Sequence, residues 1–267
     1  MGLLDSLAGM FTGGQRRRDL RQLVMSCVAD GHLSDSEREE IQQTAIRLGL
    51  SPDELGSISR DAFRAAAQAV VSDGAVDDDE LEALDRIKEF LRVAPDATDP
   101  VWRYVLQLAL ATKIRAGELP GNEPEVRALF AVPGLVLARG ETIHWVAPAV
   151  LLEERVVRRG YVGGSAGVNV RIAGGVGVNF GRHRGNLVSE RGIVPVSGGS
   201  LVFTDKRIVF RGDRKSFQLP FTKLLEYGVE RDTVRVTDAN GKSREVRLAD
   251  PSAVVVADAL LQRLGGA

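Results

Sequence analysis

The stretch ADGHLSDSE at residues 29–37 returns as SDGAVDDDE at residues 72–80, and each copy follows an apolar run. Both copies contain the spacing of a capping box, in which one side chain accepts backbone hydrogen bonds at a helix start and a glutamate reaches back. The Asp-Gly pair ahead of each box is typical of the end of the preceding helix. The repeat therefore predicts two loops that each end one helix and begin the next. The box residues are Ser34 with Glu37 and Asp77 with Glu80.

Apolar residues recur at spacings of three and four along residues 17–118, which predicts an all-α helical region. Ser51-Pro52 within it predicts the start of a short connecting helix, because proline favours the first helical position. Ahead of this region, residues 1–16 are expected to form an N-terminal arm or a short amphipathic helix that ends at Gly13-Gly14.

The acidic loops also match the second half of a calcium-binding EF-hand loop. The first half of that loop fails, because residues of an apolar, helical run stand where its first oxygen ligands belong. The second copy nevertheless carries five acids within eight residues, and a bound cation would relieve their repulsion. Two interpretations stay open: the loops only cap helices, or they also bind a divalent cation, Ca²⁺ or Mg²⁺.

The duplicated Asp-Gly-x-aliphatic-[Ser/Asp]-Asp-x-Glu motif, in a helical region of this size, resembles the TerB-like domain of tellurite-resistance and stress-response proteins. The resemblance covers about residues 17–118 and rests on a short motif. It implies a likeness in fold and a divalent-cation site shared by the two loops, and it implies no enzymatic activity. The positions that match the family's acidic residues are Asp30, Asp35, Glu37, Asp73, Asp78 and Glu80.

The composition of the 267 residues is that of a globular protein, with 44% hydrophobic and 27% charged residues. A single cysteine, Cys27, excludes an internal disulfide and suits a reducing cytoplasm. The net charge of −1 conceals an asymmetry: residues 1–120 carry −7 and residues 121–267 carry +6. This split predicts two domains with different partners. No apolar run reaches the length of a membrane span, and no secretory signal is recognised.

Residues 119–139 are rich in proline and glycine at their start and form the expected linker, with a short helix at 125–131. From residue 140 the apolar period changes to two, which predicts strands. A final amphipathic helix is expected over residues 251–264. The predicted fold class is α+β, with an N-terminal helical bundle and a C-terminal antiparallel β-barrel, residues 140–264, closed by one helix. The expected strands are 142–157, 166–172, 176–181, 186–194, 200–204, 207–211, 215–219, 232–238 and 243–248.

The stretch GSLVFTDKRIVF at residues 199–210 resembles a hairpin of GRAM-like and bacterial PH-like domains. The resemblance implies a scaffold that binds anionic lipid headgroups in some members and proteins in others. Basic residues of this half form a candidate anion or lipid site, because guanidinium groups suit phosphate. The alternative is that they lie on the solvated faces of strands. The candidates are Arg158, Arg159, Arg171, Arg182, Arg184, Lys206 and Arg207.

No arrangement of residues predicts catalysis. The glycine-rich segment 160–185 lacks the glycine spacing and the lysine of nucleotide-binding loops, and reads as a hairpin around Ala173-Gly174-Gly175. None of the three histidines has a paired histidine, cysteine or serine motif. Nucleic acid is not expected as a partner, because aromatic residues are sparse among the basic ones.

We therefore expect a cytoplasmic, non-enzymatic protein of bacterial stress response, peripheral at the inner face of the membrane. A cation-responsive helical module would be joined to a PH-like module that docks on an anionic membrane surface or a partner protein. The alternative is a purely structural protein–protein adaptor with neither metal nor lipid. The oligomeric state does not follow from the sequence.

Overall fold

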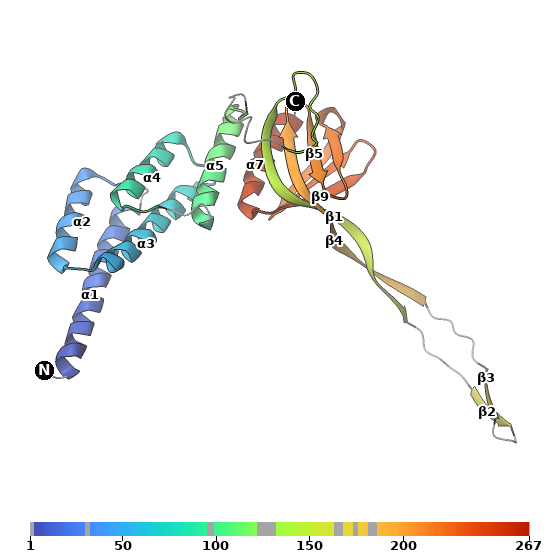
Figure 1. Ribbon diagram of the computed structural model, residues 1–267, viewed down its shortest axis with the longest axis horizontal. Coiled ribbons are helices and arrows are strands. Elements are labelled where there is room, and N and C mark those ends of the chain that lie inside the picture. The colour runs from blue at the N-terminus through green and yellow to red at the C-terminus, as the bar shows by residue number, and fades with distance from the viewer. Residues whose placement is uncertain are drawn as a thin grey trace.

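A computed structural model describes residues 3–29, 33–94, 99–121, 132–162, 168–172, 176–180 and 186–266, with side chains for 14–29, 33–94, 99–121, 132–155 and 192–266. It has an N-terminal helical region followed by an antiparallel sheet and a C-terminal helix (Figure 1). The helices of the first region are α1 Leu3–Cys27, α2 Asp35–Leu48, α3 Pro52–Val70, α4 Asp78–Phe90 and α5 Pro100–Ala116, with a 3-10 turn at Val71–Asp73.

Helix α1 runs on through Gly13 and Gly14, so the predicted helix end at these glycines is wrong. The predicted short helix after Ser51 is also longer than expected, because α3 continues for 19 residues along the apolar stripe. Leu20, Ile58 and Leu84 are buried in the core that the helices share. The predicted helix at 125–131 lies outside the described residues.

The described residues of the sheet region form nine strands. They are β1 Ile143–Val162, β2 Val168–Ile172, β3 Val176–Phe180, β4 Asn186–Thr204, β5 Arg207–Gly212, β6 Phe217–Pro220, β7 Leu224–Glu230, β8 Thr233–Asp238 and β9 Ser243–Leu248. The predicted strands 186–194 and 200–204 form one strand, β4, and β7 had no counterpart in the prediction. A 3-10 turn, Phe221–Lys223, joins β6 to β7, and a second, Pro251–Ala253, precedes helix α7 Val254–Gly265.

The predicted β-barrel is wrong, because seven strands form an open sheet in the order β6-β5-β4-β1-β9-β8-β7. The edge strands β6 and β7 do not pair with each other. β6 has only four residues and ends at Pro220, which has no N–H to donate, and a 3-10 turn then separates it from β7.

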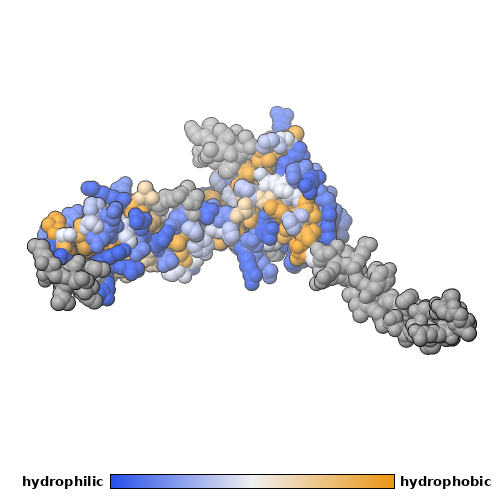
Figure 2. All heavy atoms as spheres, turned by 60° about the horizontal axis from the view of Figure 1, so that its bottom comes forward, coloured by the Kyte–Doolittle hydropathy of each residue, from blue (hydrophilic) through white to orange (hydrophobic). Residues whose placement is uncertain are grey.

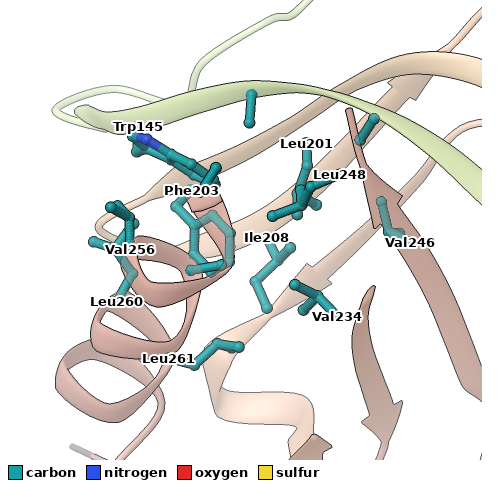
Figure 3. Close-up of a cluster of buried hydrophobic side chains, with 14 of the residues drawn as sticks. Trp145, Leu201, Phe203, Ile208, Val234, Val246, Leu248, Val256, Leu260 and Leu261 are labelled. Carbon is teal, nitrogen blue, oxygen red and sulfur yellow. The ribbon is translucent and has the colours of Figure 1, made fainter. Parts of the chain in front are cut away.

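Helix α7 covers one face of the sheet in place of a closing strand. Its Val256, Leu260 and Leu261 lie against Phe203 and Ile208 from the sheet (Figure 3). All five side chains are fully buried, so their apolar surface supplies much of the drive to fold this region.

Helix α5 belongs to both cores. Val105 and Leu108 are buried among the helices, whereas Ala111 and Ile114, further along α5, are buried in the core of the sheet region. Val255 of α7 packs back against the helical core. Figure 1 shows α5 between the remaining helices and α7. The two regions therefore pack as neighbours through a shared helix.

Candidate functional site

The two repeated loops form the capping boxes that the sequence predicted. Ser34 Oγ accepts a hydrogen bond from the Glu37 backbone N–H at 3.3 Å, and the Ser34 N–H donates to Glu37 Oε2 at 2.8 Å. In the second loop Asp77 Oδ1 accepts from the Glu80 N–H at 2.8 Å, and the Asp77 N–H donates to Glu80 Oε2 at 2.9 Å. Gly74 takes the expected left-handed conformation, with φ of 81°. Glu37 and Glu80 thus cap the N-termini of α2 and α4, respectively.

The other described acids of the predicted set also have partners within the chain. Asp35 lies 3.5 Å from Arg38 Nη1, and Asp73 Oδ1 accepts from the Ala75 N–H at 3.0 Å. Asp78 lies 2.7 Å from Lys113 Nζ of α5, and this hydrogen bond raises the pKa of Lys113. Asp30 lies outside the described residues.

Within the described residues, no three His, Cys, Asp or Glu side chains gather in a way that could hold a metal ion. The five described acids of the predicted set instead make contacts within the chain: Glu37 and Glu80 complete capping boxes, Asp35 and Asp78 form ion pairs, and Asp73 accepts a backbone hydrogen bond. Cation binding by the loops stays a prediction, and each of these five acids already has a partner within the chain.

The Thr-Asp-Lys-Arg turn between β4 and β5 is held by its own side chains. Thr204 Oγ1 accepts from the N–H groups of Lys206 and Arg207 at 3.1 and 3.0 Å. Asp205 Oδ1 accepts from the Thr142 N–H at 2.9 Å, and Lys206 Nζ donates to the Arg139 carbonyl at 3.0 Å. Lys206, a predicted anion ligand, thus also helps to fasten the segment before β1 to the sheet.

Arg207, another predicted anion ligand, forms a buried ion pair with Glu141. Arg207 Nε and Nη2 donate to the two Glu141 carboxylate oxygens at 2.7 and 2.9 Å, and the Glu141 side chain is fully buried. Arg207 also donates to the Val136 carbonyl at 2.8 Å and to Gln218. Burial by itself raises the pKa of Glu141. Hydrogen bonds from Arg207, the Ala138 N–H and Thr204 outweigh it and hold this pKa below its usual value. The guanidinium therefore has a structural partner in the chain.

Glu141 was missed at the sequence level. It is one acid in the stretch Arg-Gly-Glu-Thr just before a strand, and it belongs to no motif. Only the fold brings it to Arg207, which lies 66 residues further along the chain.

His144 is buried, and its hydrogen-bond partner among the described residues is a backbone carbonyl. Its Nδ1 lies 2.7 Å from the Pro120 carbonyl oxygen, so that nitrogen carries the proton. Its Nε2 is buried and has no hydrogen-bond partner among the described atoms. Gly121 is close by, with φ of 102° and no room for a Cβ, which would lie 2.0 Å from the Ile143 carbonyl oxygen. The histidine thus ties the segment after α5 to the start of β1.

Strands β1 and β4 continue far beyond the rest of the sheet. β9 pairs with β1 only from Ala149 to Leu152, and β5 pairs with β4 only from Gly199 to Phe203. The ladder between β1 and β4 nevertheless extends to the pair Val162–Asn186. The result is a two-stranded ribbon that projects from the sheet (Figure 1). We call residues 155–192 the arm.

The arm carries the whole positive excess of the C-terminal half. It contains seven arginines and one acid, Glu190, for a net charge of +6, and the rest of residues 121–267 has 14 basic and 14 acidic residues. The register places Arg158 opposite Glu190, Arg159 opposite Ser189 and Arg171 opposite Gly177. Arg182 and Arg184 lie outside the described residues. Five of the seven predicted anion ligands therefore belong to the arm.

A groove of about 1030 Å³ lies where the arm leaves the sheet. Leu151, Leu152, Ile193 and Phe217 line it together with charged residues of both signs. Ile193 is 60% exposed, which is unusual for a side chain of this size. Figure 2 shows hydrophobic side chains at the surface of the sheet region, interspersed with hydrophilic ones. The charged lining residues are Glu153, Glu154, Arg214, Lys215, Lys242, Arg244 and Glu245.

Ion pairs engage several charges of the groove. Lys215 pairs with Glu153, and Arg244 Nη2 lies 3.0 Å from Asp238 and stacks over Phe217 at 5.2 Å. The hydrogen bond from Lys215 lowers the pKa of Glu153. The mixed signs leave the groove with little net field, in contrast to the arm.

No helix among the described residues is long and apolar enough to cross a membrane. The sequence matches no family model, and no curated protein matches it. The likeness to TerB-like and PH/GRAM-like domains therefore rests on the short motifs and on the helical-plus-sheet architecture.

Proposed function

We propose that this chain is a non-enzymatic adaptor that docks on an anionic membrane surface through its arm. The observation that carries the proposal is the net charge of +6 in the sequence of residues 155–192, whose two ends pair as a ribbon that projects from the sheet. The proposed site of action is the inner face of the cytoplasmic membrane, where anionic lipids attract basic segments. The finer assignment, a TerB-like module fused to a PH-like one in a stress response, is supported by the motifs alone.

The net charge of the arm is large enough to support binding to an anionic membrane. A basic residue close to an anionic leaflet contributes about 1 kcal/mol of attraction, so a few arginines together support reversible binding. The attraction falls off within a Debye length, about 8 Å at physiological salt. A ribbon that projects from the sheet can bring its charges within that distance while the acidic helical region stays further away.

The groove and the acidic loops support this function less well. The cations of the groove lie among three acids, and the five described loop acids of the predicted set already have partners. A protein partner that binds the arm is the alternative function. In that case the chain would not bind vesicles made of lipid alone.

Co-sedimentation of the full chain with vesicles tests the proposal. We expect binding to phosphatidylcholine vesicles that contain phosphatidylglycerol, weak binding to phosphatidylcholine alone, and release as salt rises from about 50 to about 500 mM. Replacing arginines 158, 159, 171, 182 and 184 by glutamine should weaken binding at least ~100-fold.

A matched variant controls for charge in general. It carries glutamine at five exposed basic positions of the sheet region, Arg211, Arg214, Lys223, Lys242 and Arg247, and thus has the same net charge. It should bind the vesicles nearly as the native chain does. Equal losses in the two variants would mean that net charge alone is responsible, and absence of binding by the native chain would refute membrane docking.

A further inference from the structure

The hairpin of β2 and β3, in the middle of the arm sequence, has a regular division of residue types. Its register pairs Val168 with Phe180, Val170 with Val178 and Ile172 with Val176. Every second pair is thus apolar on both strands. Successive positions of a strand belong to opposite faces of a sheet, so these three pairs share one face of the hairpin.

The pairs between them are polar or small. Asn169 stands opposite Asn179, and Arg171 stands opposite Gly177. These positions share the other face, so the hairpin is amphipathic by its register. In the seven-stranded sheet, by comparison, the apolar face is covered by α7.

No further strand extends the hairpin among the described elements. β2 and β3 pair only with each other, in a sheet of two strands. A two-stranded hairpin by itself is marginally stable in water, and exposed apolar faces of this kind usually mark a contact with another phase or molecule.

The charge around the hairpin indicates the nature of that contact. The sequence contains no acid from Arg155 to Ser189 and six arginines in the same stretch. Apolar positions flanked by arginines suit the boundary between anionic headgroups and acyl chains. Each strand has five residues, about half of the 9–11 that a strand needs to span a bilayer, so the hairpin can enter the interface but cannot cross.

We propose that the apolar face of the β2–β3 hairpin inserts into the interfacial region of an anionic membrane and anchors the arm there. This inference rests on the proposed membrane docking and adds the hydrophobic contact that charge alone does not supply. Asn169, Asn179 and Arg171 then belong to the face toward the headgroups and water.

An environment-sensitive fluorophore at single positions tests which face enters the lipid. The full chain with Cys27 changed to alanine carries a nitrobenzoxadiazole label on Val170→Cys or, as the matched control, on Asn169→Cys. We expect a blue shift and higher emission for the label at 170 on adding anionic vesicles, and little change for the label at 169. Equal shifts at both positions, or a shift at 170 before vesicles are added, would overturn facial insertion in favour of contact with protein.

A pair of double variants tests the energetic role of the same face. Val170→Thr with Val178→Thr keeps β-branched residues and replaces one methyl on each by a hydroxyl, so vesicle binding should weaken about tenfold. Asn169→Thr with Asn179→Thr introduces the same residue on the other face and should leave binding unchanged.

The outcomes separate this inference from the proposed function. Vesicle binding could be sensitive to salt while the label at 170 shows no shift and the valine changes have no effect. That result would support membrane docking and reject insertion of the hairpin. Loss of vesicle binding altogether in the native chain would reject both.

Discussion

At the scale of residues, the most telling contacts are those that engage predicted ligand residues within the fold. Arg207 forms an ion pair with the buried Glu141, and Lys206 donates a hydrogen bond to the Arg139 carbonyl. Both belong to the Thr-Asp-Lys-Arg turn that resembles PH/GRAM-like hairpins. The described contacts of this turn therefore hold the segment before β1 against the sheet.

Replacing Glu141 by glutamine should destabilise the chain by about 3 kcal/mol, because it leaves the Arg207 guanidinium without its charge partner in a buried site. Denaturation by urea, followed by circular dichroism, measures this loss. Glu230→Gln, at an exposed position, is the control and should change the free energy of unfolding by less than about 0.5 kcal/mol. A loss no larger than that of the control would contradict the structural role of the pair.

The same pair predicts a pH dependence. The folded-state pKa of Glu141 is below its ordinary value of 4.5, so the unfolded chain takes up the proton first on acidification. The stabilisation is complete above pH 4.5 and is lost as the pH falls through the lower, folded-state pKa. Urea titrations at several pH values should show a smaller acid loss in Glu141→Gln than in the native chain, and equal slopes would contradict the assignment.

The acidic loops allow a test between capping and cation binding. Glutamine can still take part in a capping box, so Glu37→Gln and Glu80→Gln should keep nearly native stability, whereas Asp77→Ala should cost about 1 kcal/mol. Calorimetric titration of Ca²⁺ and Mg²⁺ into the full chain supplies the other half of the test. Saturable heat that disappears in either glutamine variant would show that the loops bind a cation.

At the scale of elements, features that depend on neighbouring residues were predicted from the sequence, and contacts between distant segments were not. The caps at Ser34 and Asp77 depend on residues three apart, so the sequence determined them. Barrel closure depends on whether β6 and β7 pair, and the local signal against pairing, Pro220 at the end of β6, does not by itself decide how the two edges are placed. β7 was missed because its sequence, LLEYGVE, alternates poorly. Within the arm, the sequence predicted the two strands that pair as β2 and β3, but not the projection of β1 and β4 beyond the sheet, since the length of their ladder is a property of pairing.

Helix α5 is the element that links the two cores, and a single change in it should affect both. Ile114→Ala removes a fully buried side chain from the core of the sheet region and should cost about 3 kcal/mol. Trp102 reports on the helical region and Trp145 on the sheet region, each in a background where the other is phenylalanine. We expect both probes to shift together in urea; a shift at Trp145 alone would show that the regions unfold independently.

At the scale of the whole molecule, a body with two cores joined through α5 carries one basic arm away from its acidic half. In the proposed docking, this arrangement brings the positive charge to the anionic membrane and keeps the acidic helical region away from it. The central claim is therefore that the arm, and not the body, docks on the membrane.

Deleting the arm tests that claim most directly. Arg155 and Gly192 are partners in the ladder, so residues 156–191 can be replaced by Asn-Gly, a pair that favours a two-residue hairpin turn. The measurement is co-sedimentation of the shortened chain with anionic vesicles, after urea denaturation has shown that its body is as stable as that of the native chain. We predict that the shortened chain stays in solution while the native chain sediments with the vesicles. Sedimentation of both to the same extent would contradict the account and assign the docking to the body.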